Sequence, residues 1–256
     1  MKQIVMKKKI LVLTPLAILF SVASWLVYTK VVNQSLCLAA SQENTAAVTR
    51  LLKRGANPNA VGVVPAPDCD CDTDPLHALS LAVDNPPAHC WEQMGPVPVS
   101  YKEAGVGTAT LLLRAGADVN ARDQDGSTAL MLARTPSMVK FLLAHGAKVD
   151  LRNKNGETAM LRDAGSGGGN MNALISGGAE VNARDNHGRT VLMIAVSSPF
   201  DDSADRLYVA GLAKVLTAAG AEVNARDDQG KTALGYALDN KQTDSIKYLK
   251  KIGARL

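Results

Sequence analysis

A fifteen-residue phrase recurs four times in the chain and constrains its fold more than any other feature. It reads GADVNARDQDGSTAL from Gly116, GAKVDLRNKNGETAM from Gly146, GAEVNARDNHGRTVL from Gly178 and GAEVNARDDQGKTAL from Gly220. Shorter fragments extend the pattern at both ends, as GANPNA from Gly55 and GAR from Gly253. Repeats with a period of about 20 to 50 residues are typical of stacked repeat arrays. We therefore count six units.

Each copy of the phrase contains the signals for a helix end, a turn and a helix start. Its first Gly comes shortly after a pair of large apolar residues, as Gly116 follows Leu112 and Leu113, and Gly accepts the left-handed conformation that ends many helices. The stretch 123–126 begins with Asp and ends with Gly, which is the composition of a tight turn, so the phrase bends back as a small hairpin. Thr128 then stands where a hydroxyl accepts an unpaired backbone N–H at the start of a helix.

The order of helix, helix, Gly, hairpin and Thr resembles the ankyrin repeat from Asn33 to the C-terminus. The family's T-P-L-H-x-A signature appears here mostly as T-A-L with a following Ala, at Thr128, Ala129, Leu130 and Ala133, at Thr232, Ala233, Leu234 and Ala237, and in part at Thr190, Leu192 and Ala195. The resemblance implies an all-α solenoid of about six helix-turn-helix units with short β-hairpin connections in residues 31–256. It also implies a scaffold that binds other proteins.

Charge and composition fit such a scaffold and argue against a nucleic-acid partner. Five of the 28 Lys and Arg residues precede residue 31, where there is no Asp or Glu, so the remaining 23 nearly balance the 24 acidic residues. A nucleic-acid-binding domain is expected to carry a basic face. Aromatic residues make up only 4% of the chain, which suits helices that pack through Ala and Leu.

The N-terminus has the pattern of an export signal. Lys7, Lys8 and Lys9 precede an uncharged run over residues 10–29, and Lys30 follows it. At about 1.5 Å per residue, a helix of this length spans a bilayer of about 30 Å. We expect residues 1–30 to be either an uncleaved anchor, single-pass in a bacterial inner membrane, or a signal peptide cleaved near Ala23. In both cases the positive-inside rule places the repeats in the periplasm.

Four cysteines lie in the first two units, and they are best interpreted as disulfide candidates: Cys37, Cys69, Cys71 and Cys90. An even count beyond an export signal favours disulfides, and four cysteines allow three pairings. A bond between Cys69 and Cys71 would close a strained small ring, so we expect pairings that reach Cys37 or Cys90. Free thiols and a metal site that includes His77 and His89 are the alternatives, but the spacing matches no standard zinc pattern. We expect no metal.

Two units contain extra residues. Leu76 and Leu112 are 36 residues apart, whereas the corresponding residues in unit one, Leu36 and Leu51, are 15 apart. The insertion, at about 84–99, is rich in Pro and cannot be helical. Loops of this length are often functional, and the alternative is tolerated surface length. A second, shorter excess in unit five carries Phe200. We take Phe200, and Trp91 in the insertion, as candidate partner-binding residues.

Units three and four depart from the pattern differently. Leu130 and Leu142 are only 12 residues apart, and Pro136 marks the break between the two helices of unit three. In unit four Asp163 replaces the small Ala, and a Gly-rich run follows at 165–169. A phosphate-binding loop would need Gly-Lys-Ser/Thr, which is absent from this run. We expect a frayed unit with few core contacts, where the array could flex.

The hairpin tips differ between copies, while the surrounding frame does not. This variability makes the tips the best candidates for partner recognition, and the residues we select are Gln124, Asp125, Asn155, Asn186, His187, Asp228 and Gln229. An Arg also recurs just before each turn, next to Asp or Asn, as at Arg122 and Asp123. We expect these Arg and Asp residues to pair mainly for structural reasons, because exposed ion pairs are weak and common.

Catalytic motifs are missing from the sequence. None of the four His residues lies in a recognisable nucleophile motif, and there is neither H-E-x-x-H nor a dinucleotide fingerprint. We therefore expect a non-enzymatic protein that needs no cofactor and binds no small-molecule substrate. An ankyrin array behind an export signal is similar to some envelope immunity proteins of Gram-negative bacteria, which neutralise a secreted effector such as a type VI secretion phospholipase. The alternative is an envelope scaffold or stress-protection protein that binds a resident partner.

Overall fold

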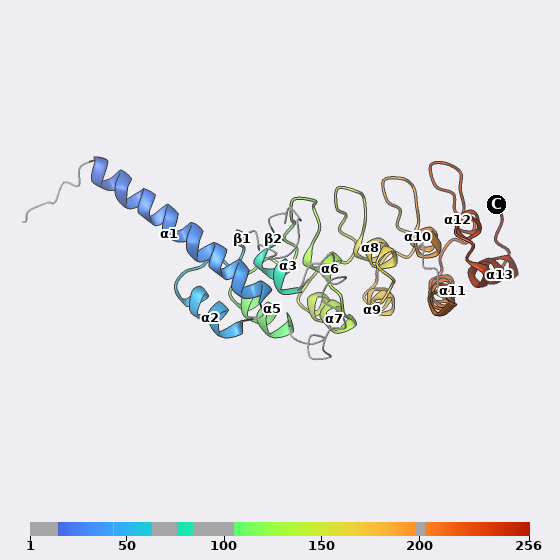
Figure 1. Ribbon diagram of the computed structural model, residues 1–256, viewed down its shortest axis with the longest axis horizontal. Helices are drawn as coiled ribbons and strands as arrows, with labels where there is room; N and C mark the ends of the chain where they lie inside the picture. Colours follow the sequence, from blue (N-terminus) through green and yellow to red (C-terminus); the bar gives the residue numbers. More distant parts are fainter. Residues whose placement is uncertain (1–14, 43, 63–75, 84–104, 198–202) are drawn as a thin grey trace, which may run out of the picture.

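The computed structural model describes residues 15–42, 44–62, 76–83, 105–197 and 203–256. These residues form an elongated array in which successive helix pairs lie side by side (Figure 1). The described hairpin loops, which follow the second helices of units two to five, project on one side of the array, and the second helix of each pair lies on the opposite side. The predicted all-α solenoid of about six helix-turn-helix units is confirmed.

Each unit contributes a first and a second helix. The first helices are the C-terminal part of α1 (Pro15–Ser41), then α3 (Ala78–Val83), α6 (Ala129–Leu132), α8 (Ala159–Gly165), α10 (Val191–Ser197) and α12 (Ala233–Asp239). The second helices are α2 (Thr45–Lys53), α5 (Gly105–Arg114), α7 (Pro136–Ala144), α9 (Met171–Ser176), α11 (Ser203–Ala218) and α13 (Thr243–Lys251). Strands β1 (Val61–Gly62) and β2 (Leu76–His77) pair antiparallel, with Val61 opposite His77.

The first Gly of the recurring phrase ends the second helix, as its sequence position predicts. Gly116 and Gly220 both have a φ of +95°, and the equivalent Gly in the other copies also lies in the left-handed region. After Gly116, the Ala117 N–H donates to the Leu112 carbonyl oxygen at 3.0 Å between N and O, which closes the helix end. The same bond forms after every second helix for which the phrase is present.

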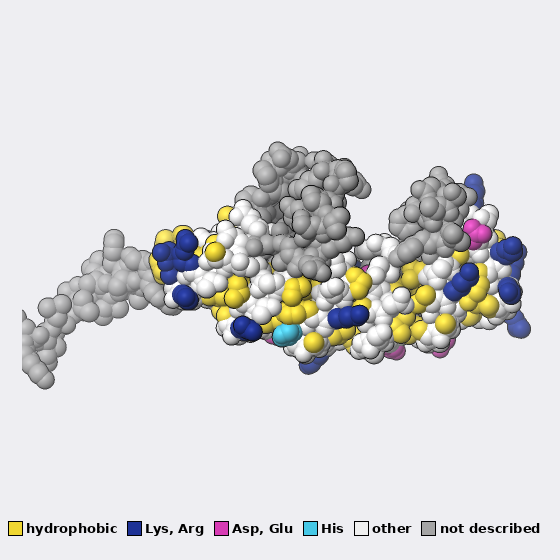
Figure 2. All heavy atoms as spheres, turned by 90° about the horizontal axis from the view of Figure 1, so that it is seen from below, with side chains coloured by type: hydrophobic (Ala, Val, Ile, Leu, Met, Phe, Trp, Pro, Cys, Tyr) yellow, Lys and Arg dark blue, Asp and Glu magenta, His cyan; other side chains and the backbone are white. Residues whose placement is uncertain are grey.

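The core runs the length of the array rather than forming one centre. Small residues on the first helices, such as Ala129 and Ala233, are almost fully buried, and large ones such as Leu112, Leu142 and Leu249 on the second helices have no exposed surface. Each helix pair packs on the next pair, so the apolar contacts continue from unit to unit. Figure 2 views the array from the side of the second helices, where Lys and Arg side chains are scattered among apolar ones.

The Thr at the start of each first helix has the predicted place, but its capping bond varies. Thr158 Oγ1 and Thr232 Oγ1 accept the N–H three residues later at 3.4 Å between N and Oγ1. Thr128 occupies the same position and forms no such bond. In unit three the stronger cap belongs to the second helix, where Thr135 Oγ1 accepts the Met138 N–H at 3.2 Å and Pro136 is the first helical residue.

Helix α1 runs without a break across residue 30, where the sequence suggested the end of an N-terminal segment. Its C-terminal part is the first helix of unit one, because Leu36 and Ala40 are fully buried there. In the described residues, no helix combines the length and the apolar character needed to cross a membrane. Residues 1–14, which contain the Lys cluster and the beginning of the run at 10–29, lie outside the described residues.

Unit four is well packed, so the expectation of a frayed unit is wrong. Met160, Leu161, Met171 and Leu174 are each at most 2% exposed. The Gly run makes a tight connection between α8 and α9, because Gly167 and Gly168 have φ values of +104° and +70°. Such values strain other residues. The glycines therefore shape a turn and do not loosen the unit.

Several predicted features fall outside the described residues. They are the insertion at 84–99 with Trp91, the loop with Phe200, and the cysteines Cys69, Cys71 and Cys90. Cys37 is described, and it is a free, fully buried thiol whose Sγ donates to the Ala60 carbonyl oxygen at 3.6 Å. Burial raises the pKa of this thiol to about 11. The disulfide pairings remain a prediction.

Candidate functional site

The seven described tip residues selected from the sequence lie along one edge of the array and are exposed: Gln124, Asp125, Asn155, Asn186, His187, Asp228 and Gln229. Two of them also have structural contacts. Asn186 Nδ2 donates to the Lys154 carbonyl oxygen at 2.7 Å, and Asp228 packs so closely on Gly188 that a Cβ there would meet Asp228 Oδ1 at 2.5 Å. The other five tip side chains form no hydrogen bond with any described residue, so they are available to a partner.

Backbone hydrogen bonds connect neighbouring tips and hold them in register. The Lys154 N–H donates to the Asp125 carbonyl oxygen at 2.8 Å, and the Asn186 N–H donates to that of Asn155 at 3.0 Å. The equivalent bond between the next two tips runs from the Asp228 N–H to the His187 carbonyl oxygen at 3.1 Å. The tip side chains therefore project from one continuous framework and not from independent loops.

The recurring Arg forms a second connection, which differs from the predicted pairing with Asp. Arg122 Nη1 donates to the carbonyl oxygen of Gly126 in its own hairpin at 3.0 Å and to that of Arg152 in the next hairpin. Arg184 makes the same pair of bonds with Gly188 and Arg226. The neighbouring acid instead bonds within its own turn, as Asp123 Oδ1 accepts the N–H groups of residues 125 and 127. The guanidinium thus clamps two hairpins through their backbones.

A recurring Asn forms a third connection closer to the helices. Asn182 Nδ2 donates to the Gly220 carbonyl oxygen at 3.0 Å, while its Oδ1 accepts the Glu222 N–H at 2.8 Å. Asn120 makes the same two bonds with Gly146 and Lys148. Asn59 and Asn224 repeat the arrangement at the two ends of the array. The three connections together make the hairpin side of the molecule a single braced surface.

A groove follows the exposed sides of the first helices in the middle of the array. It consists of two adjoining pockets of about 510 Å³ and about 390 Å³, which share Arg162 and Ser166. The larger pocket lies between α6 and α8 and extends to Arg134 and Asn170. The smaller one lies between α8 and α10 and extends to Arg189. We call these two pockets together the inner groove.

The larger pocket exists because unit three is short. Helix α6 has only four residues, whereas α8, α10 and α12 have seven each. The chain turns away from the groove after Leu132, and Thr135 and Pro136 begin the next helix at once. The first helices of units four, five and six have a further turn that α6 lacks, and the hollow lies at the place of that missing turn.

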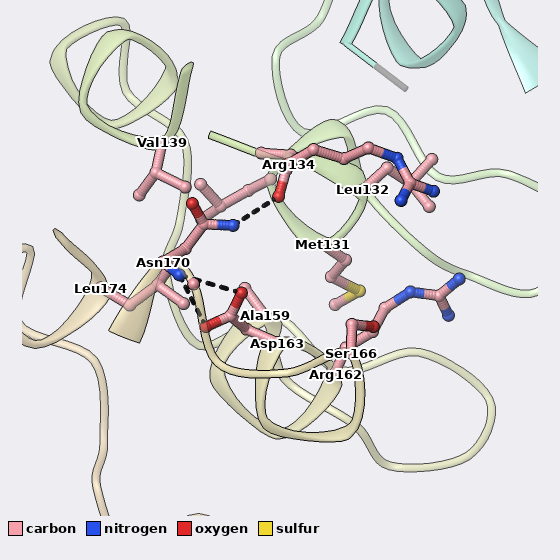
Figure 3. Close-up of a pocket in the computed structure, with 13 residues that line it drawn as sticks. Met131, Leu132, Arg134, Val139, Ala159, Arg162, Asp163, Ser166, Asn170 and Leu174 are labelled. Atoms are coloured by element: carbon pink, nitrogen blue, oxygen red, sulfur yellow. Dashed lines mark hydrogen bonds between the residues drawn. The ribbon is translucent and has the colours of Figure 1, made fainter. Parts of the chain in front are cut away.

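The charged groups of the larger pocket are separated from one another. Figure 3 shows the guanidinium groups of Arg134 and Arg162 on the same side of the pocket, while the carboxylate of Asp163 points the other way, toward Asn170. Asp163 accepts the Asn170 N–H at 3.0 Å to Oδ2 and 3.2 Å to Oδ1. Burial raises the pKa of Asp163 to about 6, although the hydrogen bond from Asn170 acts in the opposite direction.

Comparison with known proteins gives the family. A family model described as ankyrin repeats, in three copies, matches residues 101–185, 135–216 and 161–256, which together cover more than half of the chain. The chain belongs to the ankyrin-repeat family. The crystal structure of EF0377, an ankyrin repeat protein, is similar to this chain with a TM-score of 0.63 and 21% sequence identity, over 86% of this chain and 98% of that one. No curated protein matches the chain.

Ankyrin repeats are modules for protein–protein interaction, and this chain has the corresponding surface. The hairpins and the first helices form one side of the array, and the inner groove and the exposed tips lie on that side. Among the described residues, no group of three His, Cys, Asp or Glu side chains is placed to hold a metal ion.

Sequence reasoning missed the inner groove and its arginines, Arg134, Arg162 and Arg189. Within an ankyrin frame, two signals pointed to it: the short spacing between Leu130 and Leu142, and Arg side chains on or just after the first helices. The first was interpreted only as a break in the helix. The depth of the resulting hollow depends on which side chains fill the neighbouring unit, and the repeat pattern does not specify that.

Proposed function

We propose that this ankyrin array is a non-catalytic module that holds another protein against its hairpin tips and inner groove. The observation that carries the proposal is the bracing of the hairpin side by three sets of hydrogen bonds, because a surface that is ordered before binding loses little conformational entropy. The exposed tip side chains vary between copies on this constant frame, which is the arrangement expected of a specificity surface.

The chemistry of the inner groove also favours binding over catalysis. Its carboxyl with a shifted pKa, Asp163, is engaged with the N–H of Asn170 and turned away from Arg134 and Arg162. A general acid or base must instead reach a reacting group within hydrogen-bonding distance. The guanidinium groups on the opposite side supply donors and positive charge, which suit recognition of a partner.

For the setting, we propose the periplasm and a secreted toxic effector, such as a type VI secretion phospholipase, as the partner. The Lys cluster and the apolar run at 10–29 support export. The continuity of α1 from Pro15 to Ser41 would join a membrane anchor directly to unit one. An inhibitor held in this way stands beside the membrane that a phospholipase attacks. A resident envelope protein is the alternative partner.

Site-specific photo-crosslinking in intact cells tests the binding surface. A photoreactive phenylalanine at His187, on an exposed tip, should capture a partner protein, whereas the same residue at Lys140, exposed on α7, should not. Equal capture at both positions, or capture at Lys140 alone, would contradict the proposed surface. Mass spectrometry of the captured chain then distinguishes an effector from a resident envelope protein.

A growth competition tests the immunity role separately. Cells that lack this gene should be killed by neighbouring siblings that secrete the effector, and expression of the full chain should restore survival. Equal survival with and without the gene would contradict toxin neutralisation, while leaving the binding surface to the crosslinking result.

A further inference from the structure

Helix α1 extends beyond unit one, and the part next to that unit has an exposed apolar surface (Figure 1). We call residues 26–31 the neck. Four of its apolar side chains are 52 to 64% exposed: Leu26, Val27, Tyr28 and Val31. Further along the same helix, Leu36 has no exposed surface, because it packs inside unit one. The neck therefore begins where the packing of the array ends.

The apolar surface of the neck is not a single stripe. Successive residues of a helix point about 100° apart, so Leu26, Val27 and Tyr28 face three different directions. A helix that is apolar on several sides is normally covered by protein or by lipid. The Thr29 hydroxyl needs no water, because it donates to the Leu26 carbonyl oxygen at 2.9 Å between the two oxygens. The apolar run at 10–29 leads directly into the neck, so a bilayer that holds this run also reaches the neck.

Basic side chains gather at the same end of the array. Three of them lie at the C-terminal end of α2: Arg50, Lys53 and Arg54. Helix α2 runs back along α1, and the Asn57 N–H donates to Asn33 Oδ1 at 2.9 Å, so the end of α2 lies just beyond the neck. Lys30 belongs to the neck itself. Figure 2 shows Lys and Arg side chains beside apolar ones at the end from which α1 emerges.

The charge of these four side chains is not neutralised. We call them the basic collar: Lys30, Arg50, Lys53 and Arg54. All four are exposed, and none forms a hydrogen bond or an ion pair with any described residue. The described part of residues 15–62 contains these four basic residues and no Asp or Glu. A positive surface thus lies directly beside an apolar one.

We propose, on the basis of the membrane setting proposed above, that the basic collar binds the headgroups of anionic phospholipids. Lys and Arg clusters next to a membrane segment attract such lipids. The neck lies at the boundary between headgroups and acyl chains, where Tyr28 places an aromatic ring and Lys30 extends its ammonium group toward the phosphates. An acidic protein or a nucleic acid would match the charge of the collar but would leave the neck uncovered.

Lipid selectivity of the full chain tests this proposal. The protein would be reconstituted into phosphatidylcholine vesicles that contain a trace of spin-labelled phosphatidylglycerol or of spin-labelled phosphatidylcholine. Electron paramagnetic resonance measures the fraction of each label that the protein immobilises. The wild type should prefer the phosphatidylglycerol label by about threefold or more, and R50Q/K53Q/R54Q should lose most of that preference.

Two control variants separate the collar from general effects. K247Q/K250Q/K251Q removes three exposed charges from α13, at the other end of the array, and should keep the preference. R50K/R54K keeps the charge of the collar and should also keep it. The Lys cluster at 7–9 is the same in every variant, so it cannot cause a difference between them. Equal circular dichroism spectra show that folding is unchanged.

The preference should weaken between about 50 and about 500 mM NaCl, because salt screens exposed charges. Equal immobilisation of the two labels by the wild type, an unchanged preference in R50Q/K53Q/R54Q, or an equal loss in K247Q/K250Q/K251Q would overturn the inference.

This inference and the proposed function fail in different ways. If the chain enters vesicles without preferring phosphatidylglycerol, the collar inference is wrong and the membrane setting stands. If the chain does not associate with vesicles, both of these fail, and crosslinking at His187 still decides the protein-binding surface. If the lipid preference holds but no protein is captured at His187, lipid binding stands and the proposed function does not.

Discussion

Asp150 Oδ1 accepts the backbone N–H of Glu180 at 3.0 Å, and this single bond replaces the pair that Asn makes in other units. At the equivalent position, Asn182 bonds both to Glu222 and to Gly220. A carboxylate has no N–H to donate, so it cannot reproduce the second bond to the carbonyl oxygen of the Gly that ends the helix. The junction between units three and four is therefore braced less than its neighbours.

An Asp150→Asn substitution should stabilise the array. The new Nδ2 group can donate to the Gly178 carbonyl oxygen, and one such bond contributes about 0.5 to 1.5 kcal/mol to the free energy of unfolding. Urea denaturation followed by circular dichroism measures the change. The reverse substitution, Asn182→Asp, should lower the stability by a similar amount, and a gain from both substitutions would contradict the role of the second bond.

Arg184 should resist replacement by Lys, although the charge is the same. Its guanidinium reaches the carbonyl oxygens of Gly188 and Arg226 together, and an ammonium group does not present donors in that planar fork. We expect a loss of about 1 kcal/mol in the free energy of unfolding, a small value because the side chain is exposed. Arg50→Lys on α2 is the matched control and should change the stability by less than about 0.5 kcal/mol. Equal losses in both variants would indicate a nonspecific effect of the substitution.

The sequence predicted the helix ends, the turns and the helix starts of this fold well, because each of them depends on local signals. Left-handed Gly residues, Asp-to-Gly turns and the Thr position each follow from the conformational preference of one residue, as Gly116 and Thr158 show. The tip residues could also be placed, because the two residues at the tip of each turn, such as Gln124 and Asp125, point away from the array and are exposed.

The inner groove could not be predicted in the same way. Its existence depends on a missing helical turn in one unit and on the side chains of the next, and that is a relation between units. The Gly run of unit four was misinterpreted for a similar reason, since a loop of glycines alone indicates flexibility. Only the contact of Gly168 with Leu212 shows that close packing requires the absence of a side chain.

Gly168 and Gly169 should respond differently to Ala, although they are adjacent. A Cβ on Gly168 would lie 2.6 Å from Leu212 Cδ2, and its φ is +70°, whereas a Cβ on Gly169 meets no atom within 4 Å. Gly168→Ala should therefore lower the free energy of unfolding by about 1 to 3 kcal/mol. Gly169→Ala should have an effect below about 0.5 kcal/mol or a small gain, because it reduces the entropy of the unfolded chain. An effect below about 0.5 kcal/mol at both positions would instead restore the interpretation of unit four as a loose segment.

Protonation of Asp163 should make the wild type more stable as the pH falls from 7 to 5. Its pKa in the folded chain is about 6, above the ordinary value of 3.8 for an Asp carboxyl, because burial disfavours the charged form. The folded state therefore binds a proton more readily than the unfolded state between these two pKa values, and the free energy of unfolding rises as the pH decreases. The contribution between pH 7 and pH 5 is about 1 kcal/mol, and it is lost as the pH rises through 6.

Asp163→Asn isolates this contribution, because Asn keeps an acceptor for the Asn170 N–H but does not titrate. We expect the variant to be more stable than the wild type at pH 7, and the difference to shrink by about 1 kcal/mol at pH 5. Urea unfolding of both proteins at several pH values measures that difference, so other carboxyl groups cancel. A difference that is independent of pH would show that Asp163 does not titrate in this range, and one that grows toward pH 5 would reverse the assigned sign.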